Sequence, residues 1–234
     1  MDLIDALDET FDHAQRVITG ARVEQYANKT PCTEWTVRDL LEHMIGVVAG
    51  FGAAAAGTQP ARFELASDPA SQFQTAAAST LAAWRSPGVL DRVIDARPGS
   101  MPGRALAGIN LLDTATHTWD LAVATGQPPA LPDDVARAAL QASRATITSE
   151  IRPGRFAPEV AVAADASPTD RLVAFLRRTP CASSPAPARS AWRPASSRSN
   201  AEHVTRSVGC ARCVGFQNSV AAVDLPFRLR ARTR

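Results

Sequence analysis

Long apolar runs are missing from this sequence. None of its apolar stretches approaches the roughly 20 residues that cross a bilayer. The first residues, Met1 to Glu9, are acidic where a secretory signal carries positive charge. These two absences predict a cytoplasmic protein without a membrane partner.

Cysteine is scarce in residues 1–180, which contain Cys32 alone. The other three cysteines are Cys181, Cys210 and Cys213. The main part of the chain therefore has no internal disulfide partner, and we expect its thiol to be reduced. Cys210 and Cys213 have the spacing of half a zinc site, but a second pair is absent, so the motif carries little weight.

Excess positive charge is also missing from residues 1–180, which hold 16 Lys and Arg against 21 Asp and Glu. Residues 181–234 hold 9 against 2, so the formal charge of +2 describes neither part. A net acidic main part gives no reason to expect a nucleic-acid partner. Residues 181–200 are almost all Ala, Ser, Pro and Arg, which bury little apolar surface. We expect one folded domain in 1–180 and a disordered, low-complexity basic tail in 181–234.

The main pattern in the sequence is helical periodicity. Apolar residues recur at helical spacing in several long segments and in one short segment, and residues typical of helix caps lie at the ends of these segments. Thr36 with Asp39 forms a capping box, Ser67 or Asp68 caps the next helix, and Gly126 ends a later one. The sequence predicts an all-α domain with two short extended pieces, in 89–96 and 156–164. The expected helices are 2–19, 36 to about 50, 69–84, 102–125, 133–150 and 171–178.

Asp113 and His117 are the residues that do not fit an ordinary core helix. They lie four positions apart and therefore on one helix face, together with apolar Leu106 and Ile109. Burying a carboxylate and an imidazole without partners costs several kcal/mol. The two side chains must pair with each other, share a metal ion or line a polar cavity, and half of a metal site is in place.

Other residues leave two interpretations open. His43 sits at the edge of an apolar stripe, where either a metal ligand between helices or a histidine bonded to a backbone carbonyl belongs, and its position alone favours the second. Asp120, one turn beyond His117, either supports that imidazole or forms a salt bridge at the bundle edge. Cys32 is either a small buried apolar group or a reactive thiol, and the first is the commoner case. Trp35 is interpreted as a packing residue in preference to a platform for substrate.

Three segments carry a resemblance to a known family. They are Thr30-Pro-Cys-Thr-Glu-Trp-Thr-Val-Arg-Asp-Leu-Leu-Glu-His43, His117-Thr-Trp-Asp-Leu-Ala-Val-Ala-Thr-Gly-Gln-Pro128 and Asp165-Ala-Ser-Pro-Thr-Asp-Arg-Leu-Val-Ala-Phe-Leu-Arg-Arg-Thr-Pro180. Together they resemble the actinobacterial metal-binding family related to the N-terminal domain of mycothiol-dependent maleylpyruvate isomerase, in the DinB-like superfamily. The resemblance implies an up-down four-helix bundle with short additional helices.

The resemblance also implies a divalent metal held by His43, Asp113 and His117. Three protein ligands leave one coordination position open, as catalytic sites do. The expected cation is zinc first, with nickel and iron as alternatives that these donors do not distinguish.

In the enzymatic interpretation, the open position takes the thiol of mycothiol, which then attacks a small electrophile in a transfer or an isomerisation. The isomerase has a second domain that this chain lacks after Pro180, so maleylpyruvate isomerisation itself is not expected. Two alternatives remain. One is a non-enzymatic, metal-dependent binding or stress-response module, and the other is a degenerate bundle without metal. The oligomeric state is left open.

Overall fold

The computed structural model describes residues 1–32, 34–96, 99–150, 152–153 and 158–176. The expected tail of 181–234 lies outside these residues. The secondary structure begins with two helices and a 3-10 turn: α1 (Leu3–Gly20), η1 (Val23–Gln25) and α2 (Val37–Ala56). It continues with α3 (Pro69–Trp84), β1 (Val93–Ala96), β2 (Gly99–Pro102), α4 (Gly103–Thr125), α5 (Asp133–Thr146) and α6 (Pro168–Phe175).

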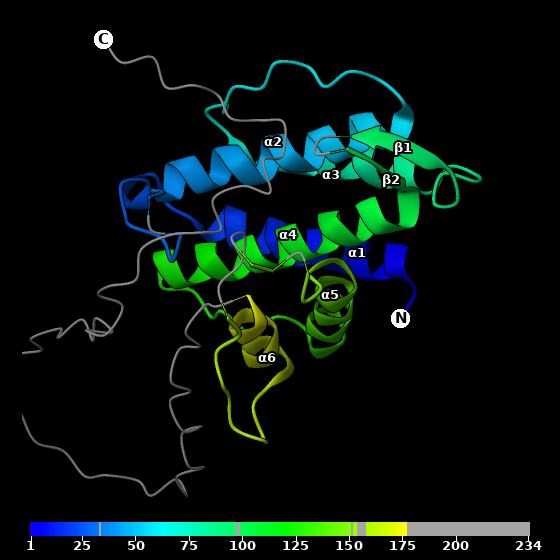
Figure 1. The fold of residues 1–234 in the computed structure, drawn as a ribbon. Helices are drawn as coiled ribbons and strands as arrows, with labels where there is room; N and C mark the ends of the chain where they lie inside the picture. Colours follow the sequence, from blue (N-terminus) through cyan, green and yellow to red (C-terminus); the bar gives the residue numbers. More distant parts are fainter. Residues whose placement is uncertain (33, 97–98, 151, 154–157, 177–234) are drawn as a thin grey trace, which may run out of the picture.

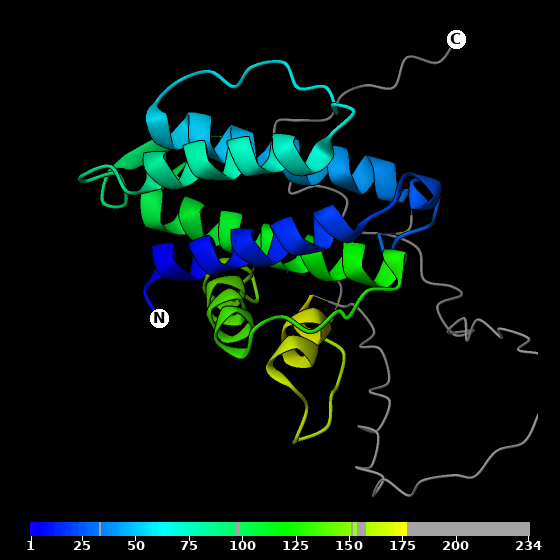
Figure 2. The same ribbon diagram turned by 180° about the vertical axis from the view of Figure 1, so that it is seen from behind.

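The four long helices α1 to α4 form a bundle, and the predicted all-α four-helix fold is confirmed (Figure 1). Helices α2 and α3 run in the same direction, joined by a connection that returns along the bundle (Figure 2). Helices α1 and α4 run the opposite way, so the order is up, down, down, up. This corrects the simple up-down alternation that the resemblance implied, because the long connection between α2 and α3 returns the chain to the end of the bundle where α2 begins. Phe11 of α1 meets Phe73 of α3 edge to face, with ring centroids 5.9 Å apart, inside this core.

Close packing of α2 on α3 explains why α2 continues past the glycines expected to end it. A Cβ atom on Gly52 would lie 2.5 Å from Oγ1 of Thr80, so glycine allows the two helices to approach there. Thr80 uses that hydroxyl to donate a 2.8 Å hydrogen bond to the carbonyl of Val48. The helix ends only at Gly57, whose φ of 71° is the left-handed conformation that glycine adopts without strain.

A short hairpin precedes α4, where the sequence predicted an extended piece followed by a break. Strands β1 and β2 pair antiparallel, with Val93 opposite Pro102 and Ile94 opposite Met101. The second strand was missed because Gly99–Pro102 has the composition of a turn and gains its structure from its partner strand.

Helix α4 is the central element of the molecule. Of its 23 residues, 17 are buried, because α1 and α2 pack on one side and α5 on another. Helices α5 and α6 lie outside the bundle on the side of α1 and α4 (Figure 1). A polar side chain on α4 is therefore enclosed by protein on almost any face of the helix.

Helix α2 is the single helix among the described residues that is long and apolar enough to cross a membrane. The sequence analysis expected no such stretch. However, 61% of its most apolar window is buried inside the bundle, as in the core helix of a folded domain.

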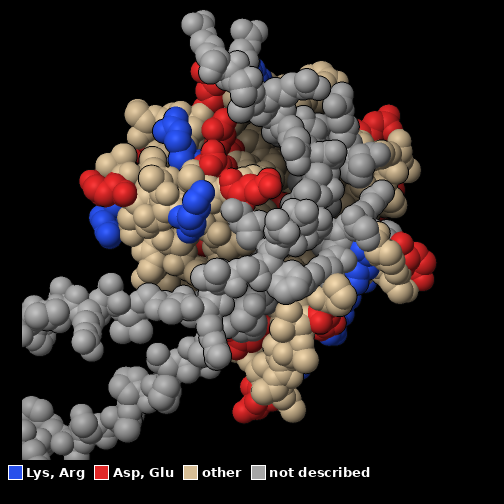
Figure 3. Space-filling model, turned by 60° about the vertical axis from the view of Figure 1, so that its left-hand side comes forward, with Lys and Arg blue, Asp and Glu red and all other residues tan. Residues whose placement is uncertain are grey.

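Figure 3 shows the charged side chains on one face of the molecule. Acidic side chains gather along one edge of a hollow on this face. Basic side chains on the same face lie among acidic and uncharged ones.

Candidate metal centre

Three predicted ligand residues from two helices meet inside the bundle. Helix α2 runs antiparallel to α4 (Figure 1), which places His43 of α2 opposite Asp113 and His117 of α4. Oδ1 of Asp113 lies 3.5 Å from Nε2 of His43 and 3.6 Å from Nε2 of His117. The two imidazole centroids are 4.8 Å apart with their planes at 77°. Both Nε2 atoms thus face one carboxylate oxygen.

The three side chains are shielded from water. Their exposed fractions are 20% for His43, 13% for Asp113 and 8% for His117. Nε2 of His43 is closed to solvent and makes no hydrogen bond to the described residues, although Asp113 approaches it. Such an atom carries a desolvation cost that a hydrogen bond or a ligand would remove.

Asp120 orients the ring of His117 from its other edge. Its Oδ2 lies 3.0 Å from Nδ1 of His117, and the Asp120 side chain is completely buried. When the ring is neutral, a proton on Nδ1 satisfies this carboxylate and leaves the lone pair of Nε2 directed at the side of Asp113 and His43. The structure therefore favours the interpretation in which Asp120 supports His117.

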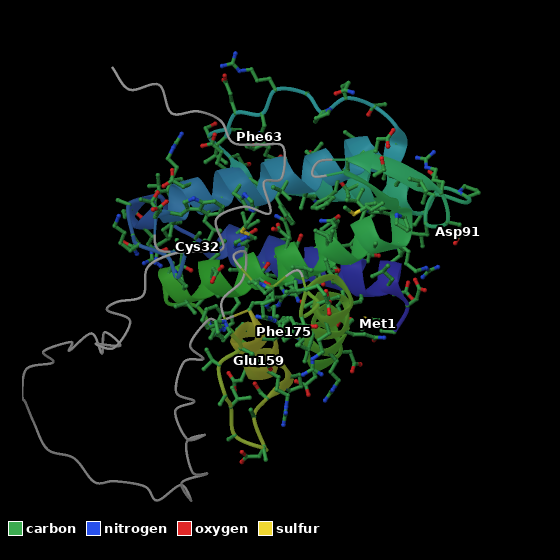
Figure 4. The ribbon with its side chains drawn as sticks, in the orientation of Figure 1. Met1, Cys32, Phe63, Asp91, Glu159 and Phe175 are labelled. Atoms are coloured by element: carbon green, nitrogen blue, oxygen red, sulfur yellow. The ribbon has the colours of Figure 1, made fainter. Side chains whose placement is uncertain are left out.

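Cys32 also reaches this cluster. Its Sγ donates a 3.3 Å hydrogen bond to Oδ2 of Asp120 and lies 3.8 Å from Nδ1 of His117. Figure 4 shows Cys32 in the segment that leads into α2, beside α4. The sequence analysis favoured the interpretation of this cysteine as a small packing residue. The structure instead places its thiol against two polar groups.

The segment before α2 is anchored to the end of α4. Gln25 donates a 2.8 Å hydrogen bond to the carbonyl of Thr125, and Asn28 donates one of 3.1 Å to that of Ala124. The hydroxyl of Thr30 accepts a 3.2 Å hydrogen bond from the backbone N–H of Cys32. These contacts hold the thiol of Cys32 near α4.

Trp35 covers the two histidines. Its ring centroid is 4.5 Å from that of His43 and 5.7 Å from that of His117. Thr36 follows at once as the N-cap of α2, with both hydrogen bonds of the predicted capping box to Asp39. The cap thus fixes where the indole and the first histidine emerge from the chain.

His117 carries an unusual charge balance. Burial by itself lowers the pKa of His117, but the charge of Asp113, the neighbouring Cys32 and the hydrogen bond to Asp120 raise it to about 10. A pKa raised this far favours the imidazolium form of the ring, between two carboxylates. A position that holds an imidazolium this strongly is electrostatically suited to a cation.

Known proteins are similar to most of this chain. Residues 7–122 match the model of the mycothiol maleylpyruvate isomerase N-terminal domain. An uncharacterized protein of Mycobacterium tuberculosis strain H37Rv, Rv0738, is 35% identical over 183 residues, which is 76% of this chain and 99% of that protein. The chain belongs to the mycothiol maleylpyruvate isomerase N-terminal domain family.

A second relative is the uncharacterized protein MT0763 of Mycobacterium tuberculosis strain CDC 1551 / Oshkosh. It has the same 35% identity and the same coverage of 76% and 99%. No solved structure matches the chain significantly. The residues matched to the family model include every member of the cluster described above, from Cys32 to Asp120.

The three predicted donors fit the metal that the sequence resemblance implied. Nitrogen and oxygen ligands about 2.0–2.2 Å from one tetrahedral zinc are about 3.3–3.5 Å from each other. The observed separations of 3.5 Å and 3.6 Å to Asp113 lie close to that value. The ligand atoms of His43, Asp113 and His117 all lie within 4.8 Å of one another. The site therefore needs little rearrangement to hold a cation.

Sequence reasoning missed Cys32 as part of the site. Periodicity identifies residues on helices, whereas Cys32 lies in an irregular segment whose path is set by hydrogen bonds to α4. The one signal available was its place in the Thr30–His43 segment, next to the first predicted ligand.

Proposed function

We propose that this protein binds one divalent cation through His43, Asp113 and His117, and uses it to activate a small thiol. The observation that carries the proposal is the convergence of three donors from two helices, one of them the buried Nε2 of His43, which has no hydrogen bond among the described residues. Three protein ligands leave a further position for an exogenous group, as in catalytic zinc sites. Zinc is the first candidate, and the same donors suit nickel or iron.

The surrounding residues prepare this site. Asp120 holds the Nδ1 proton of His117, which fixes the tautomer that presents Nε2 as a ligand and increases its basicity. Trp35 packs against both imidazoles and restricts their rotation. The desolvated surroundings strengthen each electrostatic contact inside the site.

The thiol proposed as co-substrate is mycothiol. A free thiol has a pKa of about 8.5, whereas a thiol coordinated by a divalent cation is deprotonated, and this is the chemistry that the cation supplies. The resulting nucleophile suits transfer to, or isomerisation of, a small electrophile in the cytoplasm. The support for mycothiol is membership of the family whose model is described by that name.

The first test measures bound metal. The purified protein is expected to contain about one equivalent of zinc, nickel or iron by elemental analysis, and His117→Ala is expected to lose most of it. His13→Ala is the matched control, because His13 lies on α1 outside the three-donor cluster. Equal metal content in wild type and His117→Ala would disprove the proposed site.

The second test separates an enzyme from a binding module. Mycothiol added to the cobalt-substituted protein is expected to produce thiolate-to-metal absorbance, measured as a difference spectrum so that the protein's own thiols cancel. His117→Ala is expected to show no such change. Bound metal without a thiolate signal would instead support a non-enzymatic, metal-dependent module, and absence of both would support a bundle that has lost its metal.

A further inference from the structure

Cys32, His117 and Asp120 form a second group of donors, on the opposite edge of the same imidazole. Sγ of Cys32 lies 3.3 Å from Oδ2 of Asp120 and 3.8 Å from Nδ1 of His117, and Nδ1 lies 3.0 Å from the same Oδ2. We propose that these three residues are a second cation site, selective for a thiophilic cation, which competes with the first site for His117.

The separations of these donors suit one ion. Zinc–sulfur distances of about 2.3 Å and zinc–nitrogen distances of about 2.0–2.1 Å place tetrahedral ligands about 3.3–3.6 Å apart. The observed separations are 3.0, 3.3 and 3.8 Å, so one lies at the lower edge of that interval and the other two lie within about 0.3 Å of it. All three ligand atoms also lie within 4.8 Å of one another.

The chemistry of the donors selects the kind of cation. The first site offers imidazole and carboxylate alone, whereas the second adds a sulfur, and thiolates favour soft cations. Asp120 has no exposed surface, and in the cation-free structure it accepts from the thiol and faces Nδ1 of His117. A cation that replaces the thiol proton of Cys32 and the Nδ1 proton of His117 keeps the buried carboxylate of Asp120 satisfied.

The single ring couples the two sites. A neutral imidazole has one lone pair, so a cation on Nδ1 leaves the ring proton on Nε2. That proton then points toward Asp113, whose Oδ1 is 3.6 Å from Nε2, and the first site loses a ligand. Thiophilic cations are thus expected to expel the cation of the first site. The second site stands by itself, and only this competition rests on the proposed function.

The test uses the full-length chain with Cys181, Cys210 and Cys213 replaced by serine, so that Cys32 is the sole thiol. Cadmium titrated into this metal-free parent is expected to produce ultraviolet cadmium–thiolate absorbance that saturates at one equivalent. Asp120→Asn is expected to weaken binding at least tenfold, and His43→Ala is expected to retain the absorbance. Circular dichroism and thermal melting show that each variant is folded.

Two outcomes would overturn the second site. One is a parent protein without thiolate absorbance at one equivalent of cadmium. The other is loss of the absorbance in His43→Ala, which would make Cys32 a fourth ligand of the first site.

Competition is tested on the cobalt-loaded parent. Its visible cobalt absorbance is expected to fall as the cadmium–thiolate absorbance rises, whereas Cys32→Ser needs at least tenfold more cadmium to release cobalt. Equal cadmium requirements in the two proteins would refute the coupling. A parent that never binds cobalt, yet shows cadmium–thiolate absorbance, would contradict the proposed function and leave the second site intact.

Discussion

At the scale of the residue, His117 is the group on which the site depends. Its two ring nitrogens face different carboxylates, Asp113 on one edge and Asp120 on the other. The helix supplies both neighbours, because residues at spacings of three and four share a face. A single side chain therefore links the proposed metal ligands to the buried groups behind them.

Asp120→Asn is expected to weaken metal binding by about 10–100-fold while leaving His43, Asp113 and His117 in place. The amide carries no charge and holds the His117 tautomer less strongly. Affinity is measured by competition with a chromophoric chelator. Asp12→Asn, an exposed substitution of the same type on α1, serves as the control. An unchanged affinity in Asp120→Asn would show that this carboxylate does not support the ligand.

The charge of His117 predicts how the metal-free protein responds to pH. Burial alone lowers the pKa of His117, but the neighbouring Asp113, Cys32 and Asp120 raise it from 6.5 to about 10. A pKa raised by folding contributes stability that is complete below pH 6.5 and is lost as pH rises through 10. The unfolding free energy of metal-free wild type is therefore expected to decline between pH 7 and pH 10 more steeply than that of His117→Gln. Parallel declines, measured by urea titration, would contradict the assignment.

At the scale of the element, helix contacts depend on particular small residues. Gly52 of α2 meets Thr80 of α3. A new methyl on Gly108 of α4 would instead lie 3.5 Å from the Cβ of Ala142, the one close contact with another helix among the described residues. The sequence predicted Gly108 inside a helix and Gly52 beyond the end of one, and the structure places both inside helices. Only the packing of neighbouring helices distinguishes one from the other.

Gly52→Ala and Gly108→Ala are expected to change stability in opposite directions. The first forces a methyl against the hydroxyl and backbone of Thr80 and is expected to cost about 1–3 kcal/mol. The second meets an ordinary contact and removes a helix-interior glycine, so it is expected to be neutral or to stabilise by up to about 1 kcal/mol. Denaturant unfolding of the two variants measures the difference. Equal effects would mean that α2 and α3 separate at little cost.

At the scale of the whole molecule, the described core and the candidate site lie in the first 176 residues. The buried apolar cluster runs from Ile4 to Leu176 and joins the bundle to α5 and α6. Leu172, Val173 and Phe175 of α6 are buried, so α6 is part of the folded unit and not an appendage.

Deleting 181–234 is expected to leave melting temperature and metal content unchanged, because neither the described core nor the three donors of the first site fall within it. A chain ending at residue 164 is the contrasting variant. It loses the buried side chains of α6 and is expected to lose several kcal/mol of stability. A marked loss of melting temperature or metal when 181–234 alone is deleted would show that this segment contributes to the fold.

Sequence alone determined the helices and the residues out of place on them. Cap signals such as Thr36 with Asp39, and the pairing of Asp113 with His117 on one face, are local properties of the chain. They are readable because hydrogen bonds and side-chain spacing within a helix depend only on near neighbours. The resemblance added His43 and the bundle.

Tertiary structure alone decided what surrounds those residues. The direction of α3, the strand pairing of 99–102 and the approach of Gly52 to Thr80 depend on segments far apart in the sequence. Cys32 joins the site for the same reason, since hydrogen bonds to the end of α4 set the path of its segment. Contacts between distant segments are fixed by the packing of the whole bundle, which no local pattern encodes.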